Sequence, residues 1–293
     1  MSNPYISIED ALEMIPHEKT VLLDCRWFLD GRDARAIYLE GHIPGARFLD
    51  MEKVAADLSI ENTGRHPLPS VGNYCKAIGD LGVTKDSTVI LYDSDAGTIA
   101  ARVWWMNRQL SIHSYIVTGG IQSYTGALET GESNFEGNNL ECTRVDWENT
   151  INTDELIEYV STNPNTIILD ARNEDRYLGT FEPVDPRAGN IPSAYNLPTR
   201  SLMLGGSAPA TKETIKQRMI DLIGAEGFDS VVCRDAQVVV SCGSSVTACH
   251  LAIFIEEATG RPPLLYNGSF SAWSSRFDLP IQRGKDRGTF PSL

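Results

Sequence analysis

The 293-residue sequence lacks a long apolar run, a basic amino-terminal segment and any cluster of basic residues. A transmembrane helix needs about 20 consecutive apolar residues, so we expect no membrane-spanning helix. The opening MSNPYISIEDALEMIPHEKT has no basic segment followed by an apolar one, which a signal peptide requires. These absences predict a cytoplasmic protein that has no membrane partner.

Basic residues are also few relative to acidic ones. The chain has 25 Lys and Arg against 39 Asp and Glu, which gives a formal net charge of −14. Nucleic-acid binding depends on a basic patch or stripe, so we expect no nucleic-acid partner. We interpret the acidity as a contribution to solubility.

Cysteine is sparse and scattered, with six residues and no C-x-x-C pair. Structural zinc sites need closely spaced ligands, and disulfide frameworks are typical of small secreted domains. We therefore expect no metal site and reduced thiols, most of them buried as small apolar side chains. The six are Cys25, Cys75, Cys142, Cys233, Cys242 and Cys249.

The chain contains an internal repeat. Four pairs of short segments match in the same order and at nearly constant separation, a pattern that indicates two copies of one domain. We place these copies at residues 1–135 and 150–293, joined by a polar, Gly- and Asn-rich linker at 136–149. The pairs are TVLLDCR (20–26) with TIILDAR (166–172), GHIPGARFL (41–49) with GNIPSAYNL (189–197), STVILYDSDAG (87–97) with AQVVVSCGSSV (236–246), and VTGGIQSY (117–124) with LYNGSFSA (265–272).

Each copy alternates short β-branched apolar runs with longer amphipathic segments. Runs such as VLLD, VILYD, IILD and VVVSC are apolar on both faces, which is typical of strands in a parallel sheet covered by helices. The sequence therefore predicts an α/β fold with two tandem domains, each a parallel sheet flanked by helices. Ligands of such sheets bind beyond the carboxyl ends of the strands, and Cys242 stands at one of these ends.

The stretch VVVSCGSSVTACHLAIF, residues 238–254, places a cysteine between a predicted strand and a predicted helix. The small residues Gly243, Ser244 and Ser245 let successive backbone N–H groups point toward one centre. The helix amino terminus that follows adds partial positive charge. Both features stabilise a thiolate, so we expect Cys242 to be a nucleophile.

Two comparisons narrow this chemistry. A cysteine phosphatase needs an arginine six positions after its cysteine to hold the phosphate, and this position is Ala248 here; phosphoryl transfer is therefore disfavoured. In the first copy the position equivalent to Cys242 is Asp93. A carboxylate cannot act as the sulfur nucleophile, so only the second copy is expected to be catalytic.

Four motifs resemble the tandem-domain rhodanese family of sulfurtransferases over nearly the whole chain. This resemblance implies two α/β domains with a site between them and a cysteine that becomes a persulfide. It also implies sulfur transfer from a donor to a thiol or cyanide acceptor, with no cofactor. The motifs are DCRWFLDGRDAR (24–35), YLEGHIPGARF (38–48), RVWWMNR (102–108) and DARNEDRYLGT (170–180).

The loop CGSSVT, residues 242–247, bears on the donor. Thiosulfate-type members resemble Cys-Arg-Lys-Gly-Val-Thr, whereas mercaptopyruvate-type members resemble Cys-Gly-Ser/Thr-Gly-Val-Thr. The neutral loop here is closer to the second type, and the resemblance assigns Gly243, Ser245, Val246 and Thr247 to substrate binding. Ser245 departs from the usual glycine, and a positive φ there would strain a serine.

The resemblance extends to residues outside the loop. It implies that Arg176 and Arg187 bind the donor carboxylate, because arginine suits bidentate recognition. It implies that His66 acts with Ser244 in orienting substrate or relaying a proton. Two further residues are candidates: Glu52 as an acidic partner of His66, and Arg65 as an additional cation.

Together these features predict a 3-mercaptopyruvate sulfurtransferase that forms a persulfide on Cys242 and releases pyruvate. The expected acceptor is a small thiol, reduced thioredoxin or cyanide. One alternative is a thiosulfate sulfurtransferase. Another alternative, of a different class, is a non-catalytic binding or regulatory module with the rhodanese fold.

Overall fold

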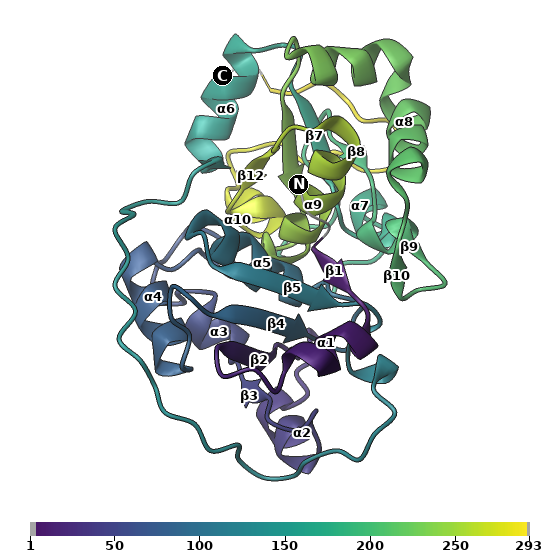
Figure 1. The fold of residues 1–293 in the computed structure, drawn as a ribbon. Helices are drawn as coiled ribbons and strands as arrows, with labels where there is room; N and C mark the ends of the chain where they lie inside the picture. The colour runs from purple at the N-terminus through teal and green to yellow at the C-terminus, as the bar shows by residue number, and fades with distance from the viewer. Residues whose placement is uncertain (1–3, 292–293) are drawn as a thin grey trace. The chain divides into compact units, whose positions relative to one another are not determined.

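Two five-stranded sheets with the same strand order organise the chain. The computed structural model describes residues 4–291. The first sheet has the order β1-β5-β4-β2-β3 and the second β6-β12-β11-β7-β8, and the neighbouring strands run parallel in both (Figure 1). Because identical orders arise when one domain is duplicated, the fold confirms the repeat, and the predicted α/β class with parallel sheets is also confirmed.

The strands are short, and the two halves contribute helices of different lengths. The strands are β1 (Tyr5–Ile6), β2 (Thr20–Asp24), β3 (Arg47–Phe48), β4 (Thr88–Tyr92), β5 (His113–Val117), β6 (Thr150–Ile151), β7 (Ile167–Asp170), β8 (Tyr195–Asn196), β9 (Met203–Leu204), β10 (Ala208–Pro209), β11 (Val238–Ser241) and β12 (Leu264–Tyr266). The helices are α1 (Ile8–Met14), α2 (Ala34–Glu40), α3 (Met51–Val54), α4 (Val71–Asp80), α5 (Ala100–Gln109), α6 (Thr153–Thr162), α7 (Glu174–Leu178), α8 (Lys212–Cys233), α9 (Val246–Thr259) and α10 (Ser269–Ser275), with short 3-10 turns η1 (Gly120–Ser123) and η2 (Thr199–Leu202). Within residues 4–291 no helix has the length and apolar character needed to cross a membrane.

The first sheet is buried on both faces, as its apolar strands predict. One face packs against α1, whose Ile8 and Ala11 join a core that also contains Ile90 and Tyr92 of β4. Helix α5 packs on β4 and β5. This two-sided cover explains why the strand VILY has no polar alternation.

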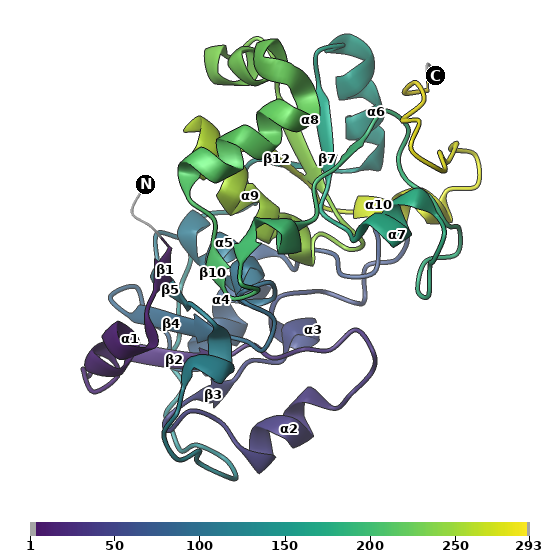
Figure 2. The same cartoon turned by 90° about the vertical axis from the view of Figure 1, so that its right-hand side faces the viewer.

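The second sheet is covered in the same way. Helices α8 and α9 pack together on one side of it, whereas α6 lies on the other (Figure 2). The core on the α6 side includes Phe270 and Trp273 of α10 and Tyr177 of α7. Helix α8 is interrupted at Gly224, whose φ of 79° and ψ of 161° are not helical. Glycine adopts this conformation without the steric cost that a Cβ brings.

The chain divides into two units whose limits differ from the predicted domains. The first unit comprises the residues up to Asp57, Leu68–Glu148 and Gly205–Pro209, and the remaining described residues form the second. The predicted linker at 136–149 therefore belongs to the first unit through Glu148. Leu58–Pro67, which carries Arg65 and His66, packs with the second unit although it lies in the first half of the sequence.

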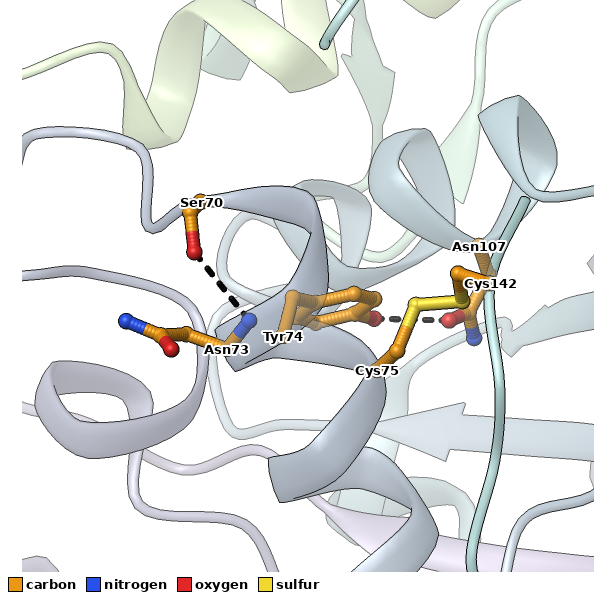
Figure 3. Close-up of a disulfide and its surroundings, with 6 residues drawn as sticks. All are labelled: Ser70, Asn73, Tyr74, Cys75, Asn107 and Cys142. Atoms are coloured by element: carbon orange, nitrogen blue, oxygen red, sulfur yellow. Dashed lines mark hydrogen bonds between the residues drawn. A yellow bond between two sulfur atoms is a disulfide. The ribbon is translucent and has the colours of Figure 1, made fainter. Parts of the chain in front are cut away.

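A disulfide joins Cys75 to Cys142, which corrects the expectation that these thiols are reduced (Figure 3). Cys75 is buried in α4, and Cys142 lies in the segment that follows the first sheet. This segment packs closely on α4, because the Asn138 N–H donates to the Gly79 carbonyl at 2.7 Å. A Cβ at Gly79 would stand 2.6 Å from the Asn138 oxygen. Tertiary packing brings the two cysteines together across 67 positions, which their spacing does not reveal.

Candidate active site

Cys242 follows the last residue of β11 and is almost fully buried, with 3% of its surface exposed. Helix α10 fixes the peptide groups around it. The Cys242 N–H donates to Ser269 Oγ at 3.2 Å. The carbonyls of Cys242 and Gly243 accept from the N–H groups of Phe270 and Ser271 at 2.9 and 2.8 Å. The loop is therefore held through its backbone, so the position of Cys242 depends little on the loop side chains.

The loop and first turn of α9 present free amide groups. The N–H groups of Gly243, Ser244, Val246, Thr247 and Ala248 meet no hydrogen-bond acceptor among residues 4–291. Buried N–H groups without an acceptor are rare in proteins, and a set of them at a helix amino terminus forms an anion site. The arrangement can stabilise a negative charge on the Cys242 side chain.

In the equivalent loop of the first unit, the backbone N–H groups bind a side chain of the loop itself. The Asp93 carboxylate accepts four backbone N–H groups, from Asp95, Gly97, Ile99 and Ala100, at 2.8 to 3.0 Å. Burial raises the pKa of Asp93, while these four hydrogen bonds act in the opposite direction. Asp93 thus accepts hydrogen bonds from its loop, whereas the N–H groups around Cys242 have no such side chain to bind within the described residues.

Ser245 adopts a left-handed backbone conformation, with φ of 63°. This is the conformation that usually selects glycine, so the strain considered from the sequence is present. Ser245 is fully buried, and its Oγ donates to Asn267 Oδ1 at 3.4 Å. Ala96, at the equivalent place in the first unit, has φ of 56°. The two loops therefore share a left-handed residue at this position, and neither uses glycine there.

Ser244 is paired with His66. The Ser244 Oγ lies 2.7 Å from His66 Nδ1, and both side chains are buried. The segment Leu58–Pro67 supplies this histidine to the second unit. The structure thus brings together the serine and histidine that the sequence proposed to act jointly.

Two guanidinium groups lie against Gly243. A Cβ built on this glycine would stand 3.0 Å from Arg65 Nη2 and 3.4 Å from Arg176 Nη1. Arg65 precedes His66, and Arg176 belongs to α7. The cations beside Gly243 are therefore Arg65 and Arg176, two of the candidates named from the sequence.

Two buried carboxylates hold these arginines. Asp185 accepts from Arg65 Nη1 at 2.6 Å and from Arg176 Nη2 at 2.9 Å. Glu182 accepts from Arg176 Nε and Nη2 at 3.0 and 2.7 Å. Burial alone would lower the pKa of Arg176, but the hydrogen bonds and charge of Glu182 outweigh it, so this pKa is raised. Burial raises the pKa of Glu182, yet the bonds from Arg176 prevail and the pKa is lowered.

Arg187 contacts the end of α10. Its guanidinium donates to the carbonyls of Ser274, Leu279, Trp273 and Arg276 at 2.6 to 3.1 Å. Four of its five N–H donors are thus used on the end of α10 and the turn that follows. Arginine at a helix carboxyl terminus satisfies its last carbonyls. These contacts leave Arg187 one N–H donor for a ligand, and the binding of the donor carboxylate by Arg187 stays a prediction.

Arg172 is buried, and its Nη1 donates to Glu182, the acid that also pairs with Arg176, at 3.4 Å. It forms a buried pair with Asp170 and donates to the Gly189 carbonyl at 2.7 Å. Its counterpart in the first unit, Arg26, pairs with Asp24 and donates to the Gly41 carbonyl at 2.8 Å. The repeated contact ties the end of each second strand to the glycine of the G-x-I-P motif.

The remaining candidates are placed as follows. Val246 and Thr247 form the first turn of α9, where their N–H groups belong to the open set around Cys242. Glu52 lies in the first unit and accepts from Trp27 Nε1 at 3.1 Å. Its pairing with His66 stays a prediction. In the described range, 4–291, no three His, Cys, Asp or Glu side chains cluster as metal ligands.

Glu182 and Asp185 are the site residues that sequence reasoning missed. They lie in the stretch FEPVDPR, where two carboxylates stand three positions apart and each is followed by a proline. That spacing was the available signal. The spacing of the two acids does not indicate their partners. Only the fold shows that they bind Arg65 and Arg176, which lie beside Gly243.

Comparisons with known proteins agree with this geometry. The family model described as a rhodanese-like domain matches twice, over residues 7–127 and 152–276. A probable 3-mercaptopyruvate sulfurtransferase from Pseudomonas aeruginosa is 34% identical over 272 residues, covering 90% of this chain and 92% of that protein. A putative thiosulfate sulfurtransferase from Mycobacterium tuberculosis is 32% identical over 267 residues, covering 90% of each chain.

A solved structure extends the comparison to the fold. The 3-mercaptopyruvate sulfurtransferase from Leishmania major superposes with a TM-score of 0.79 at 26% identity, covering 96% of this chain and 77% of that one. The two family matches coincide with the two repeats, and the sequence similarity runs across both. The chain therefore belongs to the rhodanese-like family, as a protein with two rhodanese-like domains in tandem.

Proposed function

We propose that the chain is a sulfurtransferase that moves sulfur from 3-mercaptopyruvate through a persulfide on Cys242 to a thiol acceptor. The observation that carries this proposal is the surroundings of Cys242, which combine open backbone amides with the guanidiniums of Arg65 and Arg176 at the next residue. The relative from Pseudomonas aeruginosa, named for the same activity, supports it.

The first half-reaction forms the persulfide. The Cys242 thiolate attacks the donor sulfur, the donor carbon–sulfur bond breaks, and its electron pair passes to the enolate of pyruvate. The enolate then takes a proton and leaves as pyruvate. We assign this proton delivery to Ser244, whose hydroxyl is hydrogen-bonded to His66.

The second half-reaction returns the enzyme to its starting state. An acceptor thiolate attacks the outer sulfur of the persulfide, the sulfur–sulfur bond breaks, and Cys242 leaves as a thiolate. The open amides and the α9 amino terminus stabilise the charge in both half-reactions. A small thiol, reduced thioredoxin or cyanide would serve as acceptor, in a ping-pong scheme. We propose the cytoplasm as the place of this reaction.

Arg176 and Arg65 take the role of binding the donor carboxylate. Each guanidinium approaches Gly243, the residue that follows the nucleophile. We leave Arg187 out of this role because most of its donors are used on backbone carbonyls. Guanidinium groups suit a planar carboxylate because they offer paired N–H donors.

Thiosulfate is the second candidate donor. The relative from Mycobacterium tuberculosis is named a putative thiosulfate sulfurtransferase, and two arginines near the loop would also attract an inorganic dianion. The loop itself, CGSSVT, contributes no cation. The ratio of kcat/KM values for the two donors decides between them.

Intact-mass measurement after donor treatment tests the proposal. We expect the wild-type chain to gain the mass of one sulfur atom, and Cys242→Ser to gain none, while Cys249→Ser behaves as the wild type. Arg176→Lys should raise the KM for mercaptopyruvate about tenfold. The matched variant Arg187→Lys should leave this KM unchanged. No mass gain with either donor would instead support a binding module.

A further inference from the structure

Asp185 connects the two arginines that lie beside the nucleophile. Its Oδ1 accepts from Arg65 Nη1 at 2.6 Å, and its Oδ2 accepts from Arg176 Nη2 at 2.9 Å. The arginines come from distant parts of the chain, since Arg65 lies between α3 and α4 and Arg176 lies in α7. One carboxylate thus fixes their separation.

This bridge is buried rather than superficial. The Asp185 side chain is 1% exposed, and that of Arg176 is 12% exposed. A buried carboxylate is costly unless it is paired and hydrogen-bonded. A bridge retained at such a place constrains both guanidiniums much more than a surface ion pair would.

The two arginines have matching unused donors. Arg65 Nη2 and Arg176 Nη1, the terminal nitrogens that Asp185 does not bind, make no hydrogen bond within residues 4–291. These are the atoms that lie 3.0 and 3.4 Å from the Cβ position of Gly243. Arg65 Nε is also buried and has no hydrogen-bond partner in the described structure. Each guanidinium therefore binds Asp185 through one terminal nitrogen and offers the other beside the loop.

Charge at this place is balanced. Arg65, Arg172 and Arg176 pair with Asp170, Glu182 and Asp185, so three carboxylates face three guanidiniums. A balanced cluster attracts a dianion less than two unpaired cations would. Selection between donors then depends on how well the donor's oxygens fit the two free N–H groups.

We propose that Asp185 is a positioning residue that makes the site selective for carboxylate donors. It holds Arg65 and Arg176 so that their free terminal nitrogens bind one planar carboxylate together, next to Cys242. A tetrahedral sulfur oxyanion such as thiosulfate fits this pair of donors less well. The inference rests on the proposed sulfur transfer, and it names the residue that sets the donor preference.

Steady-state kinetics of Asp185→Asn with both donors tests the inference. We expect the KM for mercaptopyruvate to rise about tenfold while kcat changes less than about twofold. The kcat/KM for thiosulfate should stay the same or increase, because the substitution removes a negative charge. Asp185→Glu, which keeps the charge and both acceptor oxygens, should restore part of the preference. Asp278→Asn, which removes an exposed carboxylate paired with Arg276, should leave both donors unaffected.

A change of equal size for both donors, or a lower kcat at constant KM, would overturn the inference. If Asp185→Asn does not fold, Asp185→Glu, whose longer side chain displaces both guanidiniums, should still raise the KM for mercaptopyruvate more than the KM for thiosulfate. Pyruvate binding to Cys242→Ser, measured by calorimetry, gives a readout that needs no turnover. Asp185→Asn in that background should weaken pyruvate binding about tenfold, and equal affinity would contradict the inference. If the wild type takes sulfur from neither donor, sulfur transfer fails, while the pyruvate measurement still decides whether Asp185 positions the arginines.

Discussion

His66 Nδ1 lies 2.7 Å from Ser244 Oγ, although 178 positions separate the two residues. The contact forms because Leu58–Pro67 packs with the second unit rather than with the first. Both side chains are buried, so the pair is shielded from exchange with bulk water. A serine held in this way can pass a proton, because the histidine serves as both donor and acceptor.

Ser244→Ala should slow mercaptopyruvate turnover by about 100-fold in kcat, the lower range for loss of general acid–base assistance. The hydroxyl delivers the proton that the departing enolate needs. Stopped-flow measurement of pyruvate release in a single turnover isolates this step from the transfer to the acceptor.

Two comparisons qualify the Ser244 prediction. Ser244→Thr retains a hydroxyl and should recover most of the rate. Thiosulfate releases sulfite and forms no enolate, so Ser244→Ala should slow its reaction much less. An equal loss with both donors would assign Ser244 to loop geometry instead of proton transfer.

Ala96→Gly should stabilise the first unit by about 1 kcal/mol, because glycine removes the steric cost of a left-handed residue. Ala96 has φ of 56°, and Ser245 has φ of 63° at the equivalent loop position. Ser245→Gly should give a smaller gain, since it also removes the contact of Oγ with Asn267. Urea denaturation measures both changes. A loss of stability in Ala96→Gly would contradict the strain at this position.

His250 should make the second unit sensitive to acid. Burial in α9 lowers the pKa of His250 from 6.5 to about 3. The unfolded chain therefore binds a proton at pH values where the folded chain does not. The stability contributed by the neutral side chain is fully present above pH 6.5. It is lost at about 1.4 kcal/mol per pH unit as the pH falls toward 3.

His250→Gln removes this titration. Between pH 7 and pH 5 the wild type should lose about 2 kcal/mol more of its free energy of unfolding than the variant. Denaturant titrations at the two pH values provide the measurement. Parallel losses in both proteins would show that other groups cause the acid sensitivity.

The disulfide between Cys75 and Cys142 should stabilise the first unit by about 4 kcal/mol, because it closes a loop across 67 positions in the unfolded chain. Cys75→Ala/Cys142→Ala should lose this amount, whereas Cys233→Ser, at an exposed free thiol, should lose nothing. Denaturation without reductant measures the difference. Persulfide formation on Cys242 should be equal in all three proteins. Peptide mapping without reduction that finds both thiols free would refute the link.

The fold could be predicted from the sequence because the strand patterns are short-range and occur in both repeats. Strand runs such as VLLD and VVVSC are apolar on both faces, which already specifies a parallel sheet covered by helices. The packing of Leu58–Pro67 with the second unit leaves no such signal. The loop at Cys242 was also readable, since small residues between a strand and a helix have a direct backbone consequence.

The positions of the arginines could not all be predicted from the residues next to them in the sequence. Arg176 lies beside the loop, next to Gly243. Arg187 instead contacts carbonyls at the end of α10, nearly 90 positions later in the chain, and its motif does not reveal these partners. Arg65 lies directly against Gly243, a position that the residues around it in the sequence do not reveal.

The sequence by itself determined two α/β repeats, a cysteine between a strand and a helix at position 242, and Asp93 at the equivalent position of the first repeat. Each of these depends on residue type and on short-range pattern, which the chain carries directly. Only the tertiary structure decided that Cys75 bonds Cys142, that His66 reaches Ser244, and that Asp185 joins Arg65 to Arg176. These contacts join residues whose separation follows from how whole segments pack, and no local preference encodes that packing.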